Sequence, residues 1–373
     1  MRAFVFAVLL AVATADLAPL FKMENKIPGE YLVVMKEETL YDDFLKGELS
    51  KIPGINIQRH FEKVFKGFEA KMDAGGLLGV RERKDVKYVE EDSIVSFLEE
   101  AASWGLDRVD QRYLPLDGEF DITGTGEGAN AYIIDTGIYP DNSYFERRAE
   151  VAFDAIGDGQ DGLDCNGHGT HCAGTIGSNP YGIAREASLY GVRVLDCFGS
   201  GAYSDVVAGC DWVAENGKRP AVGSMSLGGG ASESMDQAIR GMHNSGVAVA
   251  VAAGNSDADA CLYSPAREPL AITVGATDID DSRAYFSNYG TCVDIFAPGV
   301  NIVSTYIGSE TATASLSGTS MACPHVAGGA AVALGNNNDL TPDELVTKLV
   351  EDATTDVITD PGLGSPNKLL YVP

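Results

Sequence analysis

The pattern of apolar and polar positions between residues 26 and 98 predicts one small ordered unit. Residues 31–35 form a short apolar run typical of a buried strand, and residues 38–49 place apolar side chains at helical spacing. Residues 61–70 alternate as a half-buried strand pair does, and residues 86–97 again favour a strand. With a less regular stretch before the last strand, this order predicts a β-α-β-β-α-β unit, a small α+β domain of ferredoxin-like type.

The pattern changes after the small and polar residues 99–103. Apolar runs such as 131–134 and 247–252 now alternate with helical segments such as 204–215. Strands and helices in repeated alternation predict an α/β domain whose mostly parallel sheet is covered by helices on both faces. Gly and Ser follow the predicted strands, at the sheet edge where such folds bind ligands.

The first 15 residues have the features of a secretion signal. Arg2 provides a positive charge, residues 3–12 are nearly all apolar, and Ala13 to Ala15 form a small-residue cleavage site. We expect cleavage after Ala15, although a buried N-terminal helix is the alternative. No later run reaches the roughly 18 apolar residues that a membrane helix needs, so the sequence predicts a secreted protein without a membrane anchor.

Charge and cysteine content narrow the possible functions. Residues 16–100 carry 13 basic and 18 acidic side chains, and residues 101–373 carry 13 and 36, a net charge of −23. This acidity argues against nucleic-acid binding and favours solubility, cationic partners or bound calcium. All seven cysteines lie at or after residue 165. An odd number leaves at least one free thiol even in an oxidising compartment.

Three short motifs of the larger domain contain the residue types of acyl-transfer chemistry. Asp135 ends an apolar run, His168 opens a predicted helix, and Ser320 lies at the start of another. A hydroxyl nucleophile, an imidazole that takes its proton and a carboxylate that orients the imidazole are the parts of a catalytic triad.

Each motif alone has other interpretations. An aspartic protease needs a second Asp-Ser/Thr-Gly motif, which is absent from the sequence. His168 and His171 suggest zinc, but no third ligand in helical register is apparent. An α/β-hydrolase requires a histidine well after the serine, whereas the one later histidine is His325, five residues on. The order Asp, His, Ser remains.

That order and its surrounding motifs resemble the subtilisin superfamily in its proteinase K and aqualysin-like branch. The resemblance runs from about residue 104 to 370 and is densest at 167–175, 226–229, 252–255 and 317–328. It implies a three-layer subtilisin-like domain with a central, mostly parallel sheet. Residues 26–98 resemble the inhibitory propeptide of the same enzymes. We therefore expect a signal peptide at 1–15, an inhibitory propeptide at 16–100 and a catalytic domain at 101–373.

The site residues follow from the motifs and the resemblance together. The side-chain amide of Asn255 and the backbone N–H of Ser320 would hold the oxyanion of the tetrahedral intermediate. An extended substrate would pair with two edge segments, and small residues would leave a roomy S1 pocket that prefers apolar or aromatic side chains. The implied substrate contacts are Leu195, Gly199, Ser200, Gly201, Tyr203, Ser226, Leu227, Gly228, Ala252, Ala253 and Gly254.

Structural calcium is the expected cofactor, since hard oxygen ligands gather in two places. The first set is Asp107, Asp110, Gln111, Asp117 and Glu119, and the second is Asp294 with the carbonyls of Pro269 and Ala271. The first set is similar to a calcium loop of aqualysin-like relatives, with Glu119 as a departure in side-chain length, and the second resembles the main site of proteinase K. Asp154, Asp158 and Asp161 form a weaker third cluster.

The resemblance also implies the pairing of the cysteines. Cys165–Cys197 and Cys261–Cys292 correspond to the two bridges of the aqualysin-like branch. Cys172 matches a free cysteine beside the catalytic helix, and Cys210 and Cys323 are expected to be buried and unpaired.

The sequence thus predicts a monomeric secreted serine endopeptidase, made as a zymogen that cuts itself near Glu100–Ala101. Residues 93–100 would lie in the substrate cleft, and the cleaved propeptide would stay bound as an intramolecular inhibitor until it is digested. Protein and peptide substrates are the expected partners, with no nucleic acid and no membrane. The rival interpretation, a non-catalytic binding protein of this fold, would show a missing catalytic residue, and none is missing.

Overall fold

The structure, a computed structural model, describes residues 17–23, 26–37, 39, 49, 52–96 and 103–373. The predicted signal peptide, most of the predicted helix at 38–49 and the residues around the predicted cleavage bond lie outside this part of the chain.

The N-terminal domain is a twisted sheet of strands from distant parts of residues 17–96, in the order β1-β5-β2-β4-β3. Its elements are β1 (Leu20–Phe21), β2 (Lys26–Met35), β3 (Ile55–Phe61), β4 (Gly67–Met72), α2 (Ala74–Arg81) and β5 (Val86–Ser96). The strand pair predicted at 61–70 begins earlier, at Ile55, because alternate residues of β3 already turn inward. The irregular stretch is the helix α2. Three glycines hide its periodicity, and Asp73 caps it by accepting from Gly76 N–H at 2.8 Å.

The C-terminal domain is built on one sheet in the order β18-β19-β15-β14-β12-β10-β6-β8-β7. All neighbours from β19 to β7 are parallel, and only β18 and β19 run antiparallel. The strands are β6 (Asn130–Asp135), β7 (Ala149–Asp154), β8 (Ser188–Arg193), β10 (Ala221–Met225), β12 (Val247–Ala252), β14 (Ala271–Thr277), β15 (Ile295–Pro298), β18 (Thr354–Thr355) and β19 (Lys368–Leu369). Central strands such as β12 are buried on both faces and therefore read as continuous apolar runs.

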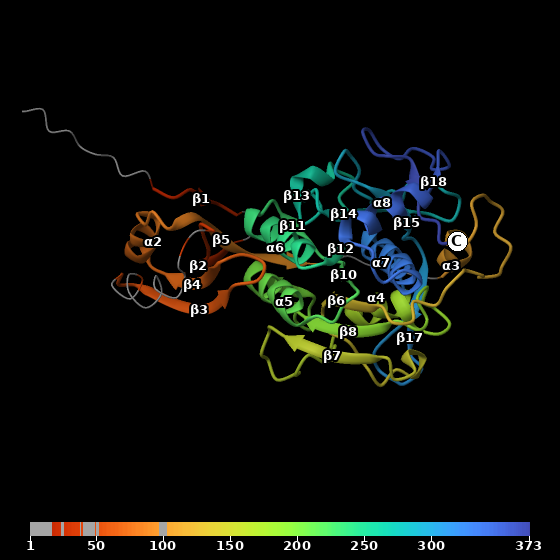
Figure 1. Cartoon of the computed structure of the whole chain (residues 1–373), viewed down its shortest axis with the longest axis horizontal. Coiled ribbons are helices and arrows are strands. Elements are labelled where there is room, and N and C mark those ends of the chain that lie inside the picture. Colours follow the sequence, from red (N-terminus) through yellow and green to blue (C-terminus); the bar gives the residue numbers. More distant parts are fainter. Residues whose placement is uncertain (1–16, 24–25, 38, 40–48, 50–51, 97–102) are drawn as a thin grey trace, which may run out of the picture.

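Helices cover both faces of this sheet (Figure 1). One face packs against α4 (His168–Gly177) and α7 (Thr319–Asn336), with α8 (Pro342–Asp352) beside α7; the other packs against α5 (Tyr203–Asn216) and α6 (Glu233–Asn244). The remaining elements are α3 (Gly105–Val109), η3 (Ser143–Phe145), η4 (Ala260–Leu262), β9 (Ser200–Ala202), β11 (Gly229–Gly230), β13 (Tyr263–Ser264), β16 (Ile302–Thr305) and β17 (Thr313–Leu316). The three-layer α/β architecture predicted from the sequence is confirmed.

Both predicted disulfides are present, Cys165–Cys197 and Cys261–Cys292, and the other three cysteines are free and buried. Two members of the third acidic cluster, Asp154 and Asp158, form ion pairs with Arg193, and Asp161 is exposed. The fully buried guanidinium of Arg193 binds both oxygens of Asp158, at 2.6 and 2.8 Å, and one oxygen of Asp154 at 3.3 Å. Arg193 thus supplies the positive charge that these two carboxylates need.

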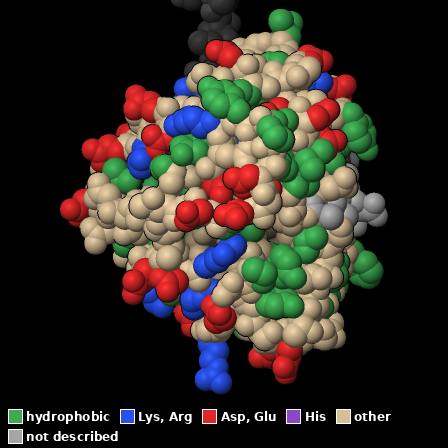
Figure 2. Space-filling view, turned by 90° about the vertical axis from the view of Figure 1, so that its right-hand side faces the viewer, with side chains coloured by type: hydrophobic (Ala, Val, Ile, Leu, Met, Phe, Trp, Pro, Cys, Tyr) green, Lys and Arg blue, Asp and Glu red, His purple; other side chains and the backbone are tan. Residues whose placement is uncertain are grey.

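The N-terminal domain sits at one end of the molecule, against α5 and α6, and the C-terminus lies at the other end near α3 (Figure 1). Phe61, Val64 and Phe65 belong to the same buried apolar cluster as Ile239 and Met242 of α6. The end remote from this contact carries several groups of acidic side chains with Lys and Arg among them (Figure 2). The face in that view shows no continuous basic stripe. Among the described residues, no helix combines the length and the apolar character needed to cross a membrane.

Candidate active site

Three neighbouring strands end at the same edge of the sheet and carry polar residues there. Asp135 is the last residue of β6, Ser226 follows β10, and Asn255 comes three residues after β12. Because parallel strands share one carboxyl edge, residues more than 100 positions apart meet at it.

Asp135 and His168 form a buried pair at this edge. His168 is the first residue of α4, and its Nδ1 lies 2.8 Å from Asp135 Oδ1, with both side chains fully buried. The same carboxylate oxygen accepts the Thr136 N–H at 2.7 Å. A carboxylate held in this way fixes the orientation and the tautomer of the imidazole, with the proton on Nδ1 and a basic Nε2.

Asp164, which the sequence analysis missed, holds the start of α4 in place. Its Oδ2 accepts the N–H and the hydroxyl of Thr170 at 2.9 and 2.6 Å. Its Oδ1 accepts the Gly167 N–H at 2.8 Å and the Thr136 hydroxyl at 2.9 Å. One buried carboxylate therefore ties the helix that carries His168 to the strand end that carries Asp135.

Ser320 is the second residue of α7, and its side chain is nearly buried. Its hydroxyl donates to the Ser226 carbonyl at 3.2 Å, and its own carbonyl accepts the Ser226 hydroxyl at 2.7 Å and the Cys172 thiol at 3.5 Å. The Cys172 sulfur lies within 4.8 Å of ligand atoms of both Asp135 and His168. The start of α7 thus lies beside the Asp–His pair.

The orientation of the Asn255 amide is set by α7. Asn255 Oδ1 accepts both the backbone N–H and the hydroxyl of Thr319, each at 2.8 Å. A backbone N–H can only donate, so the amide oxygen must face Thr319 and the NH₂ group is directed elsewhere. Gly254 has a φ of +99°, and an added Cβ would meet the Asn288 side chain at 2.5 Å. The turn therefore requires glycine, and Asn288 supports it through its bond to the Ala253 carbonyl at 2.8 Å.

The other two histidines near this site are unsuited to act as bases. His171 Nε2 lies 3.0 Å from the Ile302 carbonyl, and burial lowers the pKa of His171 to about 3. His325 Nδ1 lies 2.8 Å from the Met321 carbonyl within α7, and burial lowers its pKa to about 4. Both rings are fully buried, and each is held by a backbone carbonyl.

The predicted substrate edge is paired with an extended strand of the chain itself. β5 of the N-terminal domain runs antiparallel to β9, with Ile94 opposite Ala202, Val95 opposite Gly201 and Ser96 opposite Ser200. Gly201 has no room for a side chain, since an added Cβ would lie 2.2 Å from the Val194 carbonyl. The edge thus accepts an extended peptide by backbone pairing.

The remaining predicted substrate contacts lie around this edge. Ser226, Leu227 and Gly228 link β10 to β11, and Ala252, Ala253 and Gly254 lead from β12 to Asn255. Leu195 and Tyr203 are fully buried with Leu227 in the apolar cluster that includes residues of the N-terminal domain. The Tyr203 hydroxyl donates to the Gly230 carbonyl at 2.7 Å. With the N-terminal domain in place, these two side chains therefore belong to the core.

Comparison with known proteins agrees with this geometry. Residues 126–367 match the model of the Subtilase family, and residues 30–98 match the model described as Peptidase inhibitor I9. The chain belongs to the subtilase family. It is 44% identical to the "Extracellular serine proteinase" of Thermus sp. (strain Rt41A), over 97% of this chain and 94% of that protein. It is 43% identical to the "Cuticle-degrading protease" of Metarhizium anisopliae, over 98% and 96%.

A solved structure extends the comparison to three dimensions. The crystal structure of a cold adapted subtilisin-like serine proteinase has 50% sequence identity and a TM-score of 0.71, covering 73% of this chain and 98% of its own. The chain is accordingly an extracellular serine endopeptidase of the subtilase family, with an inhibitor I9 domain ahead of its catalytic domain.

Besides the apolar cluster and the β5–β9 pairing, the inhibitor domain of this subtilase docks through carboxylates at helix starts. Glu90 of β5 accepts the Ser234 N–H at 3.0 Å and the Ser232 hydroxyl at the start of α6, and Asp92 accepts the Ser204 N–H at 3.0 Å at the start of α5. Both carboxylates are fully buried, and burial raises the pKa of Glu90 to about 7 and that of Asp92 to about 6.

In the opposite direction, Asp211 of α5 accepts the N–H groups of Lys63 and Val64 at 2.7 and 3.0 Å. The sequence analysis missed these contacts. The acids at alternate positions 90 and 92, on one face of a buried strand, were the available signal.

The two expected calcium sets differ in how they are held. In the first, Asp107 accepts the N–H groups of Asp117 and Gly118 at 3.1 and 2.8 Å, and Asp110 accepts the Asp121 N–H at 2.7 Å. Burial, and after it the charges of Asp107 and Asp117, raise the pKa of Asp110. The carboxylates therefore lie close together, while the Gln111 NH₂ group faces backbone carbonyls and leaves its oxygen for other contacts.

In the second set, Asp294 is mostly buried and accepts the Thr273 N–H at 2.8 Å. Burial raises its pKa to about 6. A desolvated carboxylate of this kind fits a cation, as do the clustered oxygens of the first set.

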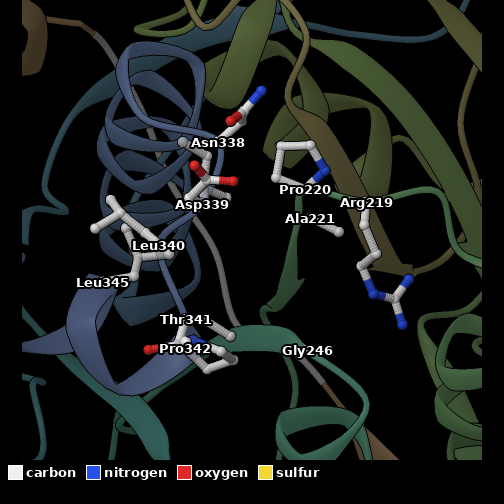
Figure 3. A pocket seen from close by; sticks show the side chains of 12 residues that line it. Arg219, Pro220, Ala221, Gly246, Asn338, Asp339, Leu340, Thr341, Pro342 and Leu345 are labelled. Atoms are coloured by element: carbon white, nitrogen blue, oxygen red, sulfur yellow. The ribbon is translucent and has the colours of Figure 1, made fainter.

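A further cavity, of about 270 Å³, lies at the opposite edge of the sheet (Figure 3). Pro220 and Ala221 at the start of β10 line one side, and Leu340 and Leu345 line the other. Its lining residues include no nucleophile–base pair. The cavity therefore takes no part in the chemistry at the carboxyl edge.

Proposed function

We propose that Asp135, His168 and Ser320 form the catalytic triad of this endopeptidase. The observation that carries the proposal is the buried 2.8 Å contact between Asp135 and His168, beside the start of the helix that bears Ser320. His168 Nε2 takes the Ser320 proton as Oγ attacks the scissile carbonyl, and then returns it to the leaving amine. Asp135 stabilises the imidazolium that forms between these steps.

The tetrahedral intermediate needs donors where its oxyanion develops. We assign this role to the Asn255 NH₂ group and to the Ser320 backbone N–H at the start of α7. The Asn255 side chain is preorganised because its oxygen is held by two donors of Thr319. No reorganisation is then needed at the moment of reaction.

Substrates are extended segments of proteins or peptides that pair with β9 as β5 does. The proposed second edge is Ser226–Gly228, and the S1 pocket lies at Ala252–Gly254, where small side chains leave room. No charged side chain belongs to these segments, which supports a broad preference for apolar or aromatic side chains at the cleaved position.

The zymogen of this enzyme is a precursor that processes itself. β5 is already paired with β9 as far as Ser96, and Glu100–Ala101 lies four residues further along the chain. We propose cleavage at or within a few residues of that bond, since Glu suits an apolar S1 pocket poorly. The cleaved domain remains docked on α5 and α6 as the inhibitor until it is digested.

The triad is tested by comparing His168→Ala with His171→Ala in the purified protein. We expect the first to lose roughly 10⁶-fold in kcat on casein, the scale found for removal of the triad histidine in subtilisin itself. The second should be less stable but keep kcat per folded molecule within several-fold. An organic fluorophosphonate should label Ser320 in His171→Ala only. Equal loss in both variants would contradict the assignment.

We further propose that calcium binds at Asp107, Asp110, Gln111, Asp117 and Glu119, and at Asp294 with the carbonyls of Pro269 and Ala271. Bound calcium would neutralise these carboxylates and stabilise the fold. Ligand present at 100 times its Kd adds about 2.7 kcal/mol to the free energy of unfolding. Melting temperatures of the mature enzyme that are equal in excess calcium and excess chelator would refute this proposal.

A further inference from the structure

A polar cavity of about 380 Å³ lies between the inhibitor domain and the catalytic domain. Glu30, Arg59 and Glu69 line it on the inhibitor side, and Asp196 and Asp205 line it on the catalytic side. It is distinct from the triad, from the docking caps of Glu90 and from both expected calcium sets.

Three carboxylates converge beside this cavity. One oxygen each of Glu30, Glu69 and Asp92 lie within 4.8 Å of one another. Calcium binds oxygen ligands at about 2.3–2.6 Å, so two ligands of one ion are at most about 5.2 Å apart. The three side chains are therefore close enough to share a single ion.

Two of these carboxylates are deeply buried and incompletely bonded. Asp92 is 0% exposed, and while its Oδ1 accepts two N–H groups, its Oδ2 has no hydrogen-bond partner in the part of the chain that the structure describes. Glu69 is 4% exposed, and its Oε2 receives no hydrogen bond from described residues, although Arg59 Nε lies 3.3 Å away. A buried carboxylate oxygen without a donor is costly, so a ligand that supplies positive charge fits here.

The local charges do not balance. Two cations, Arg59 and Lys71, face four carboxylates. These belong to Glu30, Glu69, Asp92 and Asp205. Arg59 contacts both Asp205 and Glu69, and Lys71 binds Glu30 at 2.5 Å from an exposed position. Two negative charges remain, which one divalent cation would neutralise, and Asp196 adds another across the cavity.

We propose that Glu30, Glu69 and Asp92 bind a divalent cation of the calcium type, which becomes enclosed when the inhibitor domain docks. The three ligands belong to the inhibitor domain, and water in the cavity completes the coordination shell. The catalytic domain provides the acidic far wall, so the cation also screens the repulsion between the two domains.

The cation would strengthen inhibition, a consequence that rests on the proposed function of the docked domain. Because the separated domain keeps all three ligands, the gain depends on how much more tightly the docked domain binds the ion. Calcium at 100 times its Kd for the docked domain should lower the dissociation constant of the cleaved inhibitor domain by up to about 100-fold. Calcium sites within the catalytic domain are the same before and after release and leave this constant unchanged.

The test counts calcium ions in the full precursor, held uncut by Ser320→Ala. Flow dialysis with ⁴⁵Ca would compare this precursor with versions that also carry Glu69→Gln or Glu62→Gln. Glu62 is an exposed carboxylate of the same domain and provides the matched control. We expect one ion fewer for Glu69→Gln and an unchanged count for Glu62→Gln.

Equal counts in all three proteins would overturn the proposal and would leave a shared proton to neutralise the cluster. If near-ultraviolet circular dichroism shows that Glu69→Gln is not folded, Glu30→Gln replaces it, since Glu30 is only partly buried. One ion fewer for Glu30→Gln would then support the proposal, and an equal count would overturn it. The count needs no activity, and the mass of the purified protein shows separately whether Ser320→Ala has kept the precursor intact. A lost nucleophile assignment and a lost calcium site therefore give different results.

Discussion

Two pairs of helices in the catalytic domain begin at buried N-termini that are satisfied in different ways. The helices that carry His168 and Ser320, α4 and α7, receive their bonds from within the domain, through Asp164 and Asn255. The helices α5 and α6 receive theirs from Asp92 and Glu90 of the inhibitor domain.

The fold therefore depends on the inhibitor domain at α5 and α6 but not at α4 and α7. The half that we propose to perform the chemistry is preorganised by its own residues, so we expect it to keep that arrangement after processing. The other half would lose two buried carboxylate caps on release of the inhibitor domain, although α6 would keep the Ser232 hydroxyl that accepts the Met235 N–H at 3.2 Å. A capping residue contributes about 0.5–2 kcal/mol, so the docked domain stabilises the helices on which it sits.

Asp164→Ala should have the largest effect on the helices α4 and α7. Several buried donors would lose their acceptor, each at about 1–3 kcal/mol, so the mature enzyme should lose roughly 3–5 kcal/mol in the free energy of unfolding. Displacement of His168 by about 1 Å would also lower kcat by up to roughly 10²-fold. Urea denaturation and casein hydrolysis measure both effects. Asp161→Asn, at an exposed position of the same loop, should change neither.

Acid should destabilise the half of the catalytic domain that contains α4 and α7. The pKa values of His171 and His325 are lowered by burial to about 3 and about 4, below the value of about 6.5 in the unfolded chain. Below pH 6.5 the unfolded state therefore binds more protons than the folded state. The contribution of the two neutral histidines to the free energy of unfolding is complete above that pH and is lost as the pH falls. We expect the two histidines together to lower the free energy of unfolding by roughly 4 kcal/mol between pH 7 and pH 5.

The measurement is the free energy of unfolding of fluorophosphonate-inhibited mature enzyme against pH. His325→Gln should reduce the slope by about one proton. A slope that this substitution leaves unchanged would show that His325 is not among the groups that take up protons on unfolding.

Asn255→Ala should separate catalysis from docking. Loss of one oxyanion donor costs roughly 10²–10³ in kcat, a value measured in subtilisin itself, while KM should change little. Thr319→Ala removes one of the two donors to Asn255 Oδ1 and should cause a smaller loss in the same direction. A rise in KM with unchanged kcat would instead assign Asn255 to substrate binding.

Glu90→Ala should have the converse effect and act on the precursor alone. It removes a buried charged acceptor, worth about 1.5–3 kcal/mol, so the inhibitor domain should dissociate roughly 10–100-fold more readily. The lag before casein hydrolysis would shorten, and the mature enzyme should have unchanged kcat/KM. Glu62→Ala provides the control, and a changed mature enzyme would contradict the division between the two helix pairs.

Much of this organisation is predictable from the sequence because the determinants are local. The apolar run 247–252 coincides with β12, and helical spacing at 204–215 lies within one residue of α5 at each end. The motifs around Asp135, His168 and Ser320 each stand at a strand end or helix start. Such positions are set by periodicity and by capping within a few residues.

The residues that were missed act across the fold. Asp164 serves two segments of the site, and Thr319 orients a side chain 64 positions away. Arg193 binds one carboxylate at the end of β7 and another in the loop that follows. Glu90 finds its partners 142 and 144 residues later, in another domain. Their residue types are ordinary in sequence, and only the arrangement of strand ends and helix starts gives them a role.

The proposed mechanism requires that Ser320 cuts the chain's own strand next to the edge where that strand is docked. Purified precursor and its Ser320→Ala variant would be incubated side by side, and the N-terminus of each product sequenced. We predict a new N-terminus within a few residues of Ala101 in the first and an intact chain in the second. Cleavage of Ser320→Ala at the same bond, under conditions that exclude other proteases, would contradict the claim.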